Sequence, residues 1–167
     1  MSAPEHLMDL YVGELKDLWS ANDQMARTVK KLVTLASDSD LKDMLKTSQE
    51  GIMQHTQTLK ELISAAGEKV SKEHCKGMEG LVAEAVKHTT TEGPSKGPVL
   101  DAVIIAQYQR MTHYGIAGFG TAAAYAAAVG RKDDKKKLNA ITKSAYAGDQ
   151  YMTKLAETSV NIEAVES

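Results

Sequence analysis

Four side chains in this sequence could bind a metal ion, namely Glu14, Glu50, His55 and His113. Carboxylate oxygens combined with imidazole nitrogens suit iron or manganese. Glu14 falls in a run of hydrophobic residues at helical spacing that begins at Leu7, so we expect its side chain to point inward. The polar neighbours of His55 favour a position on the surface. His113 could instead be a hydrogen-bonded histidine in the core or in an interface, without binding metal. These residues are far apart in the sequence, so they form one site only if the fold brings their segments together.

Long helices are the elements that must position these residues. The chain has 3 prolines, and the long segments between them are free to be helical. Hydrophobic residues recur at helical spacing in four segments, and Gly67 and Gly130 stand where two of these segments should end. The turn "SDSD" separates the first two segments, and we expect Ser39 or Asp40 to cap the second. The sequence therefore predicts four helices, over residues 4–36, 40–66, 98–129 and 133–157.

The connection between the second and third predicted helices is long. It contains the polar segment "GEKVSKEHCKG", the short helical segment "MEGLVAEAVKHTT" and the loop "TEGPSKGP". A simple up-and-down bundle needs no such connection, whereas a crossover lets the third helix run parallel to the second. The prediction is an all-α fold, a ferritin-like four-helix bundle with a long crossover carrying a short extra helix. We expect residues 1–167 to form a single domain, with residues 158–167 fraying at its end.

Composition limits the classes of function. The net charge is −2 and only 5% of the residues are aromatic, so we expect no nucleic-acid partner. The longest apolar stretch, residues 122–129, is far too short to cross a bilayer, so we expect no membrane partner. The start of the sequence does not resemble a signal peptide, and a single cysteine, Cys75, excludes an internal disulfide. We therefore expect a cytoplasmic protein.

Several stretches of the sequence are similar to those of one bacterial family. The segments "DLYVGELKDLWSANDQM", "CKGMEGLVAEA" and "DAVIIAQYQRMTHYGIAGFGT" resemble the YciE/YciF family of small ferritin-like proteins, and helical periodicity alone would not produce them. The resemblance covers nearly the whole chain. It implies a ferritin-like bundle that pairs as a homodimer and is associated with the stress response, without a settled biochemical activity.

The metal site that such a bundle usually carries is incomplete in this sequence. A two-metal carboxylate site needs an inward Glu from each of two helices and a Glu-x-x-His pair from each of the other two. Here the segment that begins at Glu50 has Met53 at the position where a Glu-x-x-His pair would have its histidine. The resemblance implies acidic residues at further positions where this chain has neutral ones, namely Asn22, Thr112, Gly115 and the pair Ser144 and Ala145.

Three functions remain compatible with the sequence. The first is a non-enzymatic, stress-associated homodimer with a degenerate di-metal site and no cofactor. The second is an iron- or manganese-binding oxidoreductase or peroxide-handling protein with a rearranged site formed by Glu14, Glu50, His55 and His113. The third is a module that binds an unidentified protein partner through the helix rich in glycine and alanine after His113.

Overall fold

The computed structural model describes residues 3–167 and contains no strand within that range. Each of the four predicted long helices is present, with ends within a few residues of the predicted ones. The remaining helical segments are a short helix in the middle connection and a short helix at the C-terminus, each next to a π-helical turn. The segments are α1 (Leu7–Leu35), α2 (Ser39–Ala65), α3 (Lys76–Val86), η1 (Lys87–Thr91), α4 (Pro98–Ala128), α5 (Lys132–Leu155), η2 (Ala156–Val160) and α6 (Asn161–Glu166).

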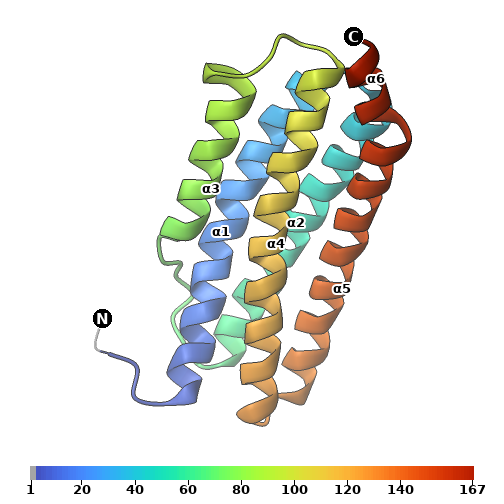
Figure 1. Cartoon of the computed structure of the whole chain (residues 1–167). Helices are drawn as coiled ribbons and strands as arrows, with labels where there is room; N and C mark the ends of the chain where they lie inside the picture. The colour runs from blue at the N-terminus through green and yellow to red at the C-terminus, as the bar shows by residue number, and fades with distance from the viewer. Residues whose placement is uncertain (1–2) are drawn as a thin grey trace.

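The four long helices form a bundle with one crossover, as predicted (Figure 1). Helix α1 is antiparallel to α2, and α4 is antiparallel to α5, through short turns. The long connection returns the chain to the end at which α2 begins, so α2 and α4 run in the same direction (Figure 1). It carries α3, which packs on the outside against α1 and α4. This topology places α1 and α4 side by side, and α2 beside α5.

Local signals in the sequence account for the helix ends. Asp9 accepts hydrogen bonds from the backbone N–H groups of Glu5 and His6 at the start of α1. Pro98 occupies the first turn of α4, where its missing N–H has no cost. Gly67 and Gly130 follow α2 and α4 with φ angles of 79° and 80°, a left-handed conformation that favours glycine, so both end helices as predicted.

The turn between α1 and α2 is capped differently from the prediction. Asp38, rather than Ser39 or Asp40, accepts a hydrogen bond of 2.7 Å from the backbone N–H of Leu41. The carboxylate of Asp101 on α4 accepts two further bonds, from the N–H of Ser37 at 2.7 Å and from that of Asp38 at 2.9 Å. Because Asp101 holds these two amides, the turn is fixed by a distant helix and not only by its own sequence.

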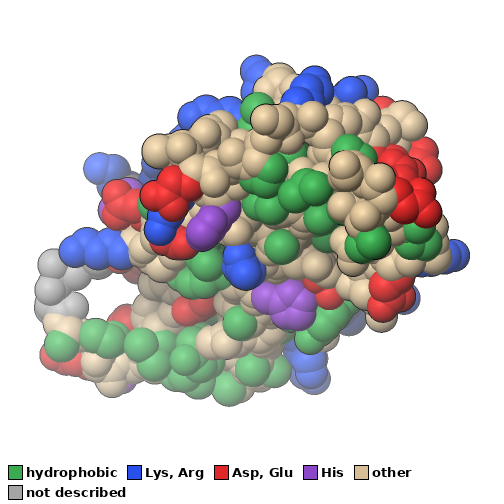
Figure 2. Space-filling model, turned by 45° about the horizontal axis from the view of Figure 1, so that its top comes forward, with side chains coloured by type: hydrophobic (Ala, Val, Ile, Leu, Met, Phe, Trp, Pro, Cys, Tyr) green, Lys and Arg blue, Asp and Glu red, His purple; other side chains and the backbone are tan. Residues whose placement is uncertain are grey.

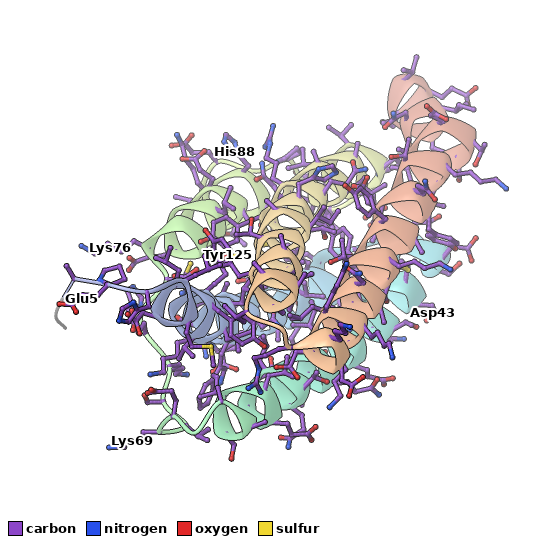
Figure 3. All side chains as sticks on the ribbon, turned by 90° about the horizontal axis from the view of Figure 1, so that it is seen from below. Glu5, Asp43, Lys69, Lys76, His88 and Tyr125 are labelled. Atoms are coloured by element: carbon purple, nitrogen blue, oxygen red, sulfur yellow. The ribbon has the colours of Figure 1, made fainter. Side chains whose placement is uncertain are left out.

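The core of the bundle consists of two hydrophobic clusters. One contains Met25 and Ile52 and extends to α3, and the other contains Phe119 and Ile141 and lies toward the α4–α5 turn. Viewed along the bundle from below, charged side chains such as Asp43 and Lys69 lie on its outside (Figure 3). Acidic and basic side chains are interspersed with hydrophobic ones on the face that Figure 2 shows. Within residues 3–167, no helix is both long and apolar enough to cross a membrane.

The C-terminal residues, for which the sequence predicts fraying at 158–167, are helical in the structure as far as Glu166. The chain continues from α5 through the π-helical turn η2 into α6 (Figure 1). The side chain of Val160 is only 1% exposed, and α6 and η2 both pack against α4. Burial of Val160 therefore holds this end of the chain against the bundle.

Candidate functional site

A cavity lies at the centre of the bundle, where the two hydrophobic clusters meet. Its volume is about 150 Å³, and residues from α1, α2, α4 and α5 line it. Thr47 on α2 and Ser144 on α5 are exposed, so the cavity opens between these two helices and reaches inward to α1 and α4. The lining residues are Asn22, Met25, Met44, Thr47, Ser48, Gly51, Ile52, His55, Tyr108, Thr112, Gly115, Phe119, Ile141, Ser144, Ala145 and Gly148.

Two polar side chains at the inner end of the cavity lack a hydrogen-bond partner in the part of the protein that the structure describes. They are Asn22 on α1, which is 6% exposed, and Thr112 on α4, which is 5% exposed. The unpaired atoms are Asn22 Nδ2 and Thr112 Oγ1. Buried polar groups in proteins are nearly always paired, so these two atoms are exceptions among the buried polar groups beside the cavity.

His55 is the one predicted metal ligand that lines the cavity. It is half-buried, and its ring makes an edge contact with Phe119, with 6.1 Å between the ring centroids. The polar neighbours of His55 suggested a surface position, and this prediction was wrong because α2 turns the imidazole toward the cavity. Burial lowers the pKa of His55, so its neutral form dominates at pH 7.

The outer part of the cavity contains a second polar pair. The hydroxyl groups of Ser48 on α2 and Tyr108 on α4 are 2.9 Å apart and share a hydrogen bond. A Cβ atom at Gly148 would come within 3.2 Å of the Tyr108 hydroxyl and 3.1 Å of the Met44 methyl group, so glycine leaves the space that both side chains occupy. No local pattern in the sequence indicated the bond between Tyr108 and Ser48, which lie 60 residues apart in the chain.

The structure does not bring the other three predicted ligands to the cavity. Glu50 is exposed, and His113 is exposed and contacts Asp149, with 3.0 Å between Nε2 and Oδ2. Glu14 is half-buried and faces Gly118 of α4, at the edge of a groove beside the N-terminal arm. Burial, with a smaller effect of the nearby Asp17, raises the pKa of Glu14.

The residues around the cavity do not fit a pair of iron or manganese ions. Within residues 3–167, no three His, Cys, Asp or Glu side chains are close enough together to hold a metal ion. The cavity offers one imidazole, one amide and several hydroxyl groups, whereas these ions require carboxylates to balance their charge. The positions at which the family resemblance implied acids line this same cavity, and they are Asn22, Thr112, Gly115, Ser144 and Ala145.

Cys75 lies outside the cavity, at the start of α3. It is fully buried, and its Sγ is 3.4 Å from the backbone N–H of Met78 and 3.0 Å from the Tyr114 hydroxyl, which in turn donates to Asp17. Burial raises the pKa of the Cys75 thiol, which keeps it protonated at pH 7. This group therefore fastens α3 to α1 and α4.

Comparison with known proteins places the chain among relatives of the same length and fold. It is 31% identical over 157 residues to Protein YciF from Escherichia coli (strain K12), and the alignment covers 93% of both chains. The crystal structure of the E. coli stress protein YciF has a TM-score of 0.87 and 29% identity, and the match covers 95% of this chain and 99% of that one. YcfI from Rhodopseudomonas palustris, described as a candidate structural protein, has a TM-score of 0.86 and 28% identity, over 92% of this chain and 97% of that one.

A family model covers almost the whole chain. The family described as "Domain of unknown function (DUF892)" matches residues 6–165, a range that includes all four long helices and every residue that lines the cavity. The chain therefore belongs to the DUF892 family, and YciF and YcfI are its relatives in sequence and in fold.

Proposed function

We propose that this chain is a non-enzymatic, stress-associated protein of the cytoplasm that acts as a homodimer and whose bundle centre no longer binds metal. The observation that supports the proposal best is the chemistry of the central cavity, which carries neutral side chains where a ferritin-like bundle places carboxylates. The similarity to a stress protein and to a candidate structural protein supports the non-enzymatic role.

The charge requirement explains why the metal would be lost. Two divalent ions carry four positive charges, and in a buried site these must be offset by carboxylates that also supply the coordinating oxygens. No Asp or Glu belongs to the lining of the cavity, and burial lowers the pKa of the half-buried His55, which favours its neutral form. One imidazole with amide and hydroxyl groups cannot supply the missing charge.

Elemental analysis tests this proposal directly. The protein is purified without chelator from cells grown with added iron and manganese, and metal is measured per chain. We expect far less than one ion per chain. One or two bound iron or manganese ions per chain would refute the proposal and favour the alternative, a metal-binding oxidoreductase.

A gain-of-binding variant makes the test sharper. If missing charge is the cause, the double variant Asn22→Asp with Gly115→Glu should bind Mn²⁺ more tightly than the natural protein, because both positions line the cavity. A Cβ at Gly115 meets only Phe119, at the ordinary contact distance of 3.8 Å. The matched control, Asn139→Asp with Gly120→Glu, adds the same charges away from the cavity and should leave Mn²⁺ binding unchanged.

The exposed side of α4 supports the homodimer. This helix is apolar nearly all round, and its exposed residues include Ala117, Ala124 and Ala127. Small exposed residues let a second helix approach closely. Light scattering should give the mass of two chains, and Ala124→Glu should halve it. A natural protein that is monomeric at micromolar concentration would contradict this part of the proposal.

A further inference from the structure

The central cavity is long and narrow. Its lining extends over residues 44–55 of α2 and residues 108–119 of α4, and each of these stretches rises by about 16 Å along its helix. On α5 the lining extends over residues 141–148, a rise of about 10 Å. The volume is about 150 Å³, and a sphere of that volume would be less than half as long as the lining stretch of α2. The cavity is therefore a slot along the bundle.

Large side chains stand at the two ends of this slot. At one end, a Cβ atom at Gly148 would lie 3.1 Å from the Met44 methyl group and 3.2 Å from the Tyr108 hydroxyl, so both side chains reach the same point. At the other end, the rings of His55 and Phe119 make their edge contact. Side chains from α2 and α4 therefore set the length of the slot.

Small residues keep the middle of the slot open. Gly51 on α2, Gly115 on α4 and Ala145 on α5 line the cavity between its two ends. Apart from its own stretch of helix, no atom lies within 4 Å of a Cβ built at Gly51. The slot opens between α2 and α5, which contact each other least among the neighbouring pairs of long helices. A thin molecule can therefore enter there without separating tightly packed helices.

The wall of the slot suits an uncharged, apolar occupant. None of its lining side chains is Asp, Glu, Lys or Arg, and Met25, Ile52 and Ile141 contribute apolar surface. A charged group inside would lose its hydration and find no opposite charge. A polar end group would instead lie at the mouth, where Thr47 and Ser144 are exposed.

We propose that the slot binds one unbranched alkyl chain of about 8–12 carbons, since an extended chain with C–C bonds of about 1.5 Å advances about 1.3 Å per carbon and the slot is about 10–16 Å long. Fatty acids and long-chain alcohols share this chain and differ in the end group at the mouth. The inference rests on the proposed absence of metal from the bundle centre, and it goes further in assigning a ligand class to that centre.

The experiment is a calorimetric titration of the metal-free, full-length protein at pH 7. The probes are unbranched 1-alkanols and carboxylates of about six to fourteen carbons, each kept below its solubility limit and its critical micelle concentration. We expect one alkyl chain per protein chain. The affinity should rise roughly fourfold with each added methylene, because each is removed from water. The rise should stop at about 12 carbons, where the slot is full.

Two comparisons among the probes test the shape of the site and its end group. The compound 1-adamantanol has as many carbons as 1-decanol in a compact cage, so it should bind much more weakly than 1-decanol. Equal binding of decanoate and 1-decanol would place the end group in water and identify a fatty acid as a suitable ligand, whereas binding of 1-decanol alone would identify an alcohol. Both of these results support an alkyl chain in the slot.

Variants locate the alkyl chain. Gly51→Leu places a side chain in the middle of the slot and should weaken 1-decanol binding roughly tenfold, as if about two methylenes were lost. Its matched control is Gly13→Leu, because Gly13 is also a half-buried glycine of a long helix with open space at its Cβ, and it does not line the cavity. A second pair is Ala145→Leu, which also narrows the slot, and Ala147→Leu, at an exposed position of α5 outside the lining. Both controls should bind 1-decanol like the natural protein.

The outcomes separate this inference from the proposed function. Metal-free protein that binds neither 1-decanol nor decanoate overturns the inference and leaves the proposed function in place. An affinity that keeps rising to fourteen carbons, equal binding of 1-adamantanol, or binding that Gly51→Leu and Ala145→Leu leave unchanged also overturns it. Stoichiometric iron or manganese in the purified protein overturns the proposed function, and the inference with it.

Discussion

The unpaired hydroxyl of Thr112 leads to a prediction about stability. Replacing Thr112 by valine should raise the free energy of unfolding, because valine has the same shape and lacks the hydroxyl that finds no partner in the described protein. An unsatisfied buried hydrogen-bonding group costs about 1–3 kcal/mol. The hydroxyl oxygen of Thr112 lies out of reach of water, including water in the cavity. We therefore expect a gain of at least about 1 kcal/mol.

Urea unfolding, monitored by both circular dichroism and tryptophan fluorescence, measures this gain. In a separate thermal unfolding experiment, a gain of about 1 kcal/mol in a chain of this length should raise the melting temperature by about 2–4 °C. The slope of the unfolding free energy with urea should not change, since the surface exposed on unfolding is the same.

Thr28→Val is the matched control for this prediction. Thr28 is also buried on a long helix, but its hydroxyl donates a hydrogen bond of 3.0 Å to the carbonyl of Gln24. Valine and threonine have similar helix propensities, so the two substitutions differ mainly in whether a bond is lost. We expect no gain from Thr28→Val. If Thr112→Val destabilised the protein by 1 kcal/mol or more, the Thr112 hydroxyl would be making a stabilising bond, and the reasoning about the inner end of the cavity would fail.

Three further predictions concern other parts of the bundle. Asp101→Ala should destabilise the protein by about 2–3 kcal/mol in urea unfolding, because two backbone amides of the α1–α2 turn lose a charged acceptor; an effect below about 0.5 kcal/mol would contradict this role. Gly118→Ala should lower the melting temperature because its Cβ would lie 2.6 Å from the buried Leu18, whereas Gly120→Ala, with open space around it, should raise the melting temperature. Glu14→Gln should stabilise the protein at pH 7, and a gain that persisted at pH 3 would show that charge is not the cause.

The sign of the Glu14 effect follows from its raised pKa. A carboxyl whose pKa is higher in the folded than in the unfolded state binds more protons when folded, so stability falls as the pH rises from the unfolded toward the folded pKa. Above that window the folded protein carries the full cost of a partly buried charge beside Asp17. Glutamine removes the cost, and below the unfolded pKa both side chains are neutral.

Much of the fold was predictable because its determinants are local. Hydrophobic spacing identified the four long helices, and Gly67 and Gly130 marked two of their ends. The crossover followed from the length of the middle connection. The cap by Asp38 was not predictable, because Asp101, 63 residues away along the chain, holds the backbone of that turn. The helix at the C-terminus was likewise not predicted, since the burial of Val160 depends on the folded bundle.

The candidate site was predictable only in part. The family resemblance implied acidic residues at positions 22 and 112, where this chain has Asn22 and Thr112. Both of these residues line the cavity. Glu50 and His113 appeared to be candidates because of their chemistry, but the helical rotation at each position turns the side chain outward. Whether a residue on a helix faces the centre depends on packing of all four helices, and a shift of one residue turns a side chain by about 100°.

The unpaired polar side chains at the bundle centre are not what the loss of a metal site alone would leave behind. If loss of metal were the only change, an apolar core that closed the cavity would be the more stable replacement, since matched hydrophobic residues in place of buried polar groups are neutral or stabilising. The chain instead retains an amide and a hydroxyl, both unpaired, beside glycine at positions 115 and 148. The bundle centre therefore carries neutral polar groups beside an open space, where a closed apolar core would be more stable.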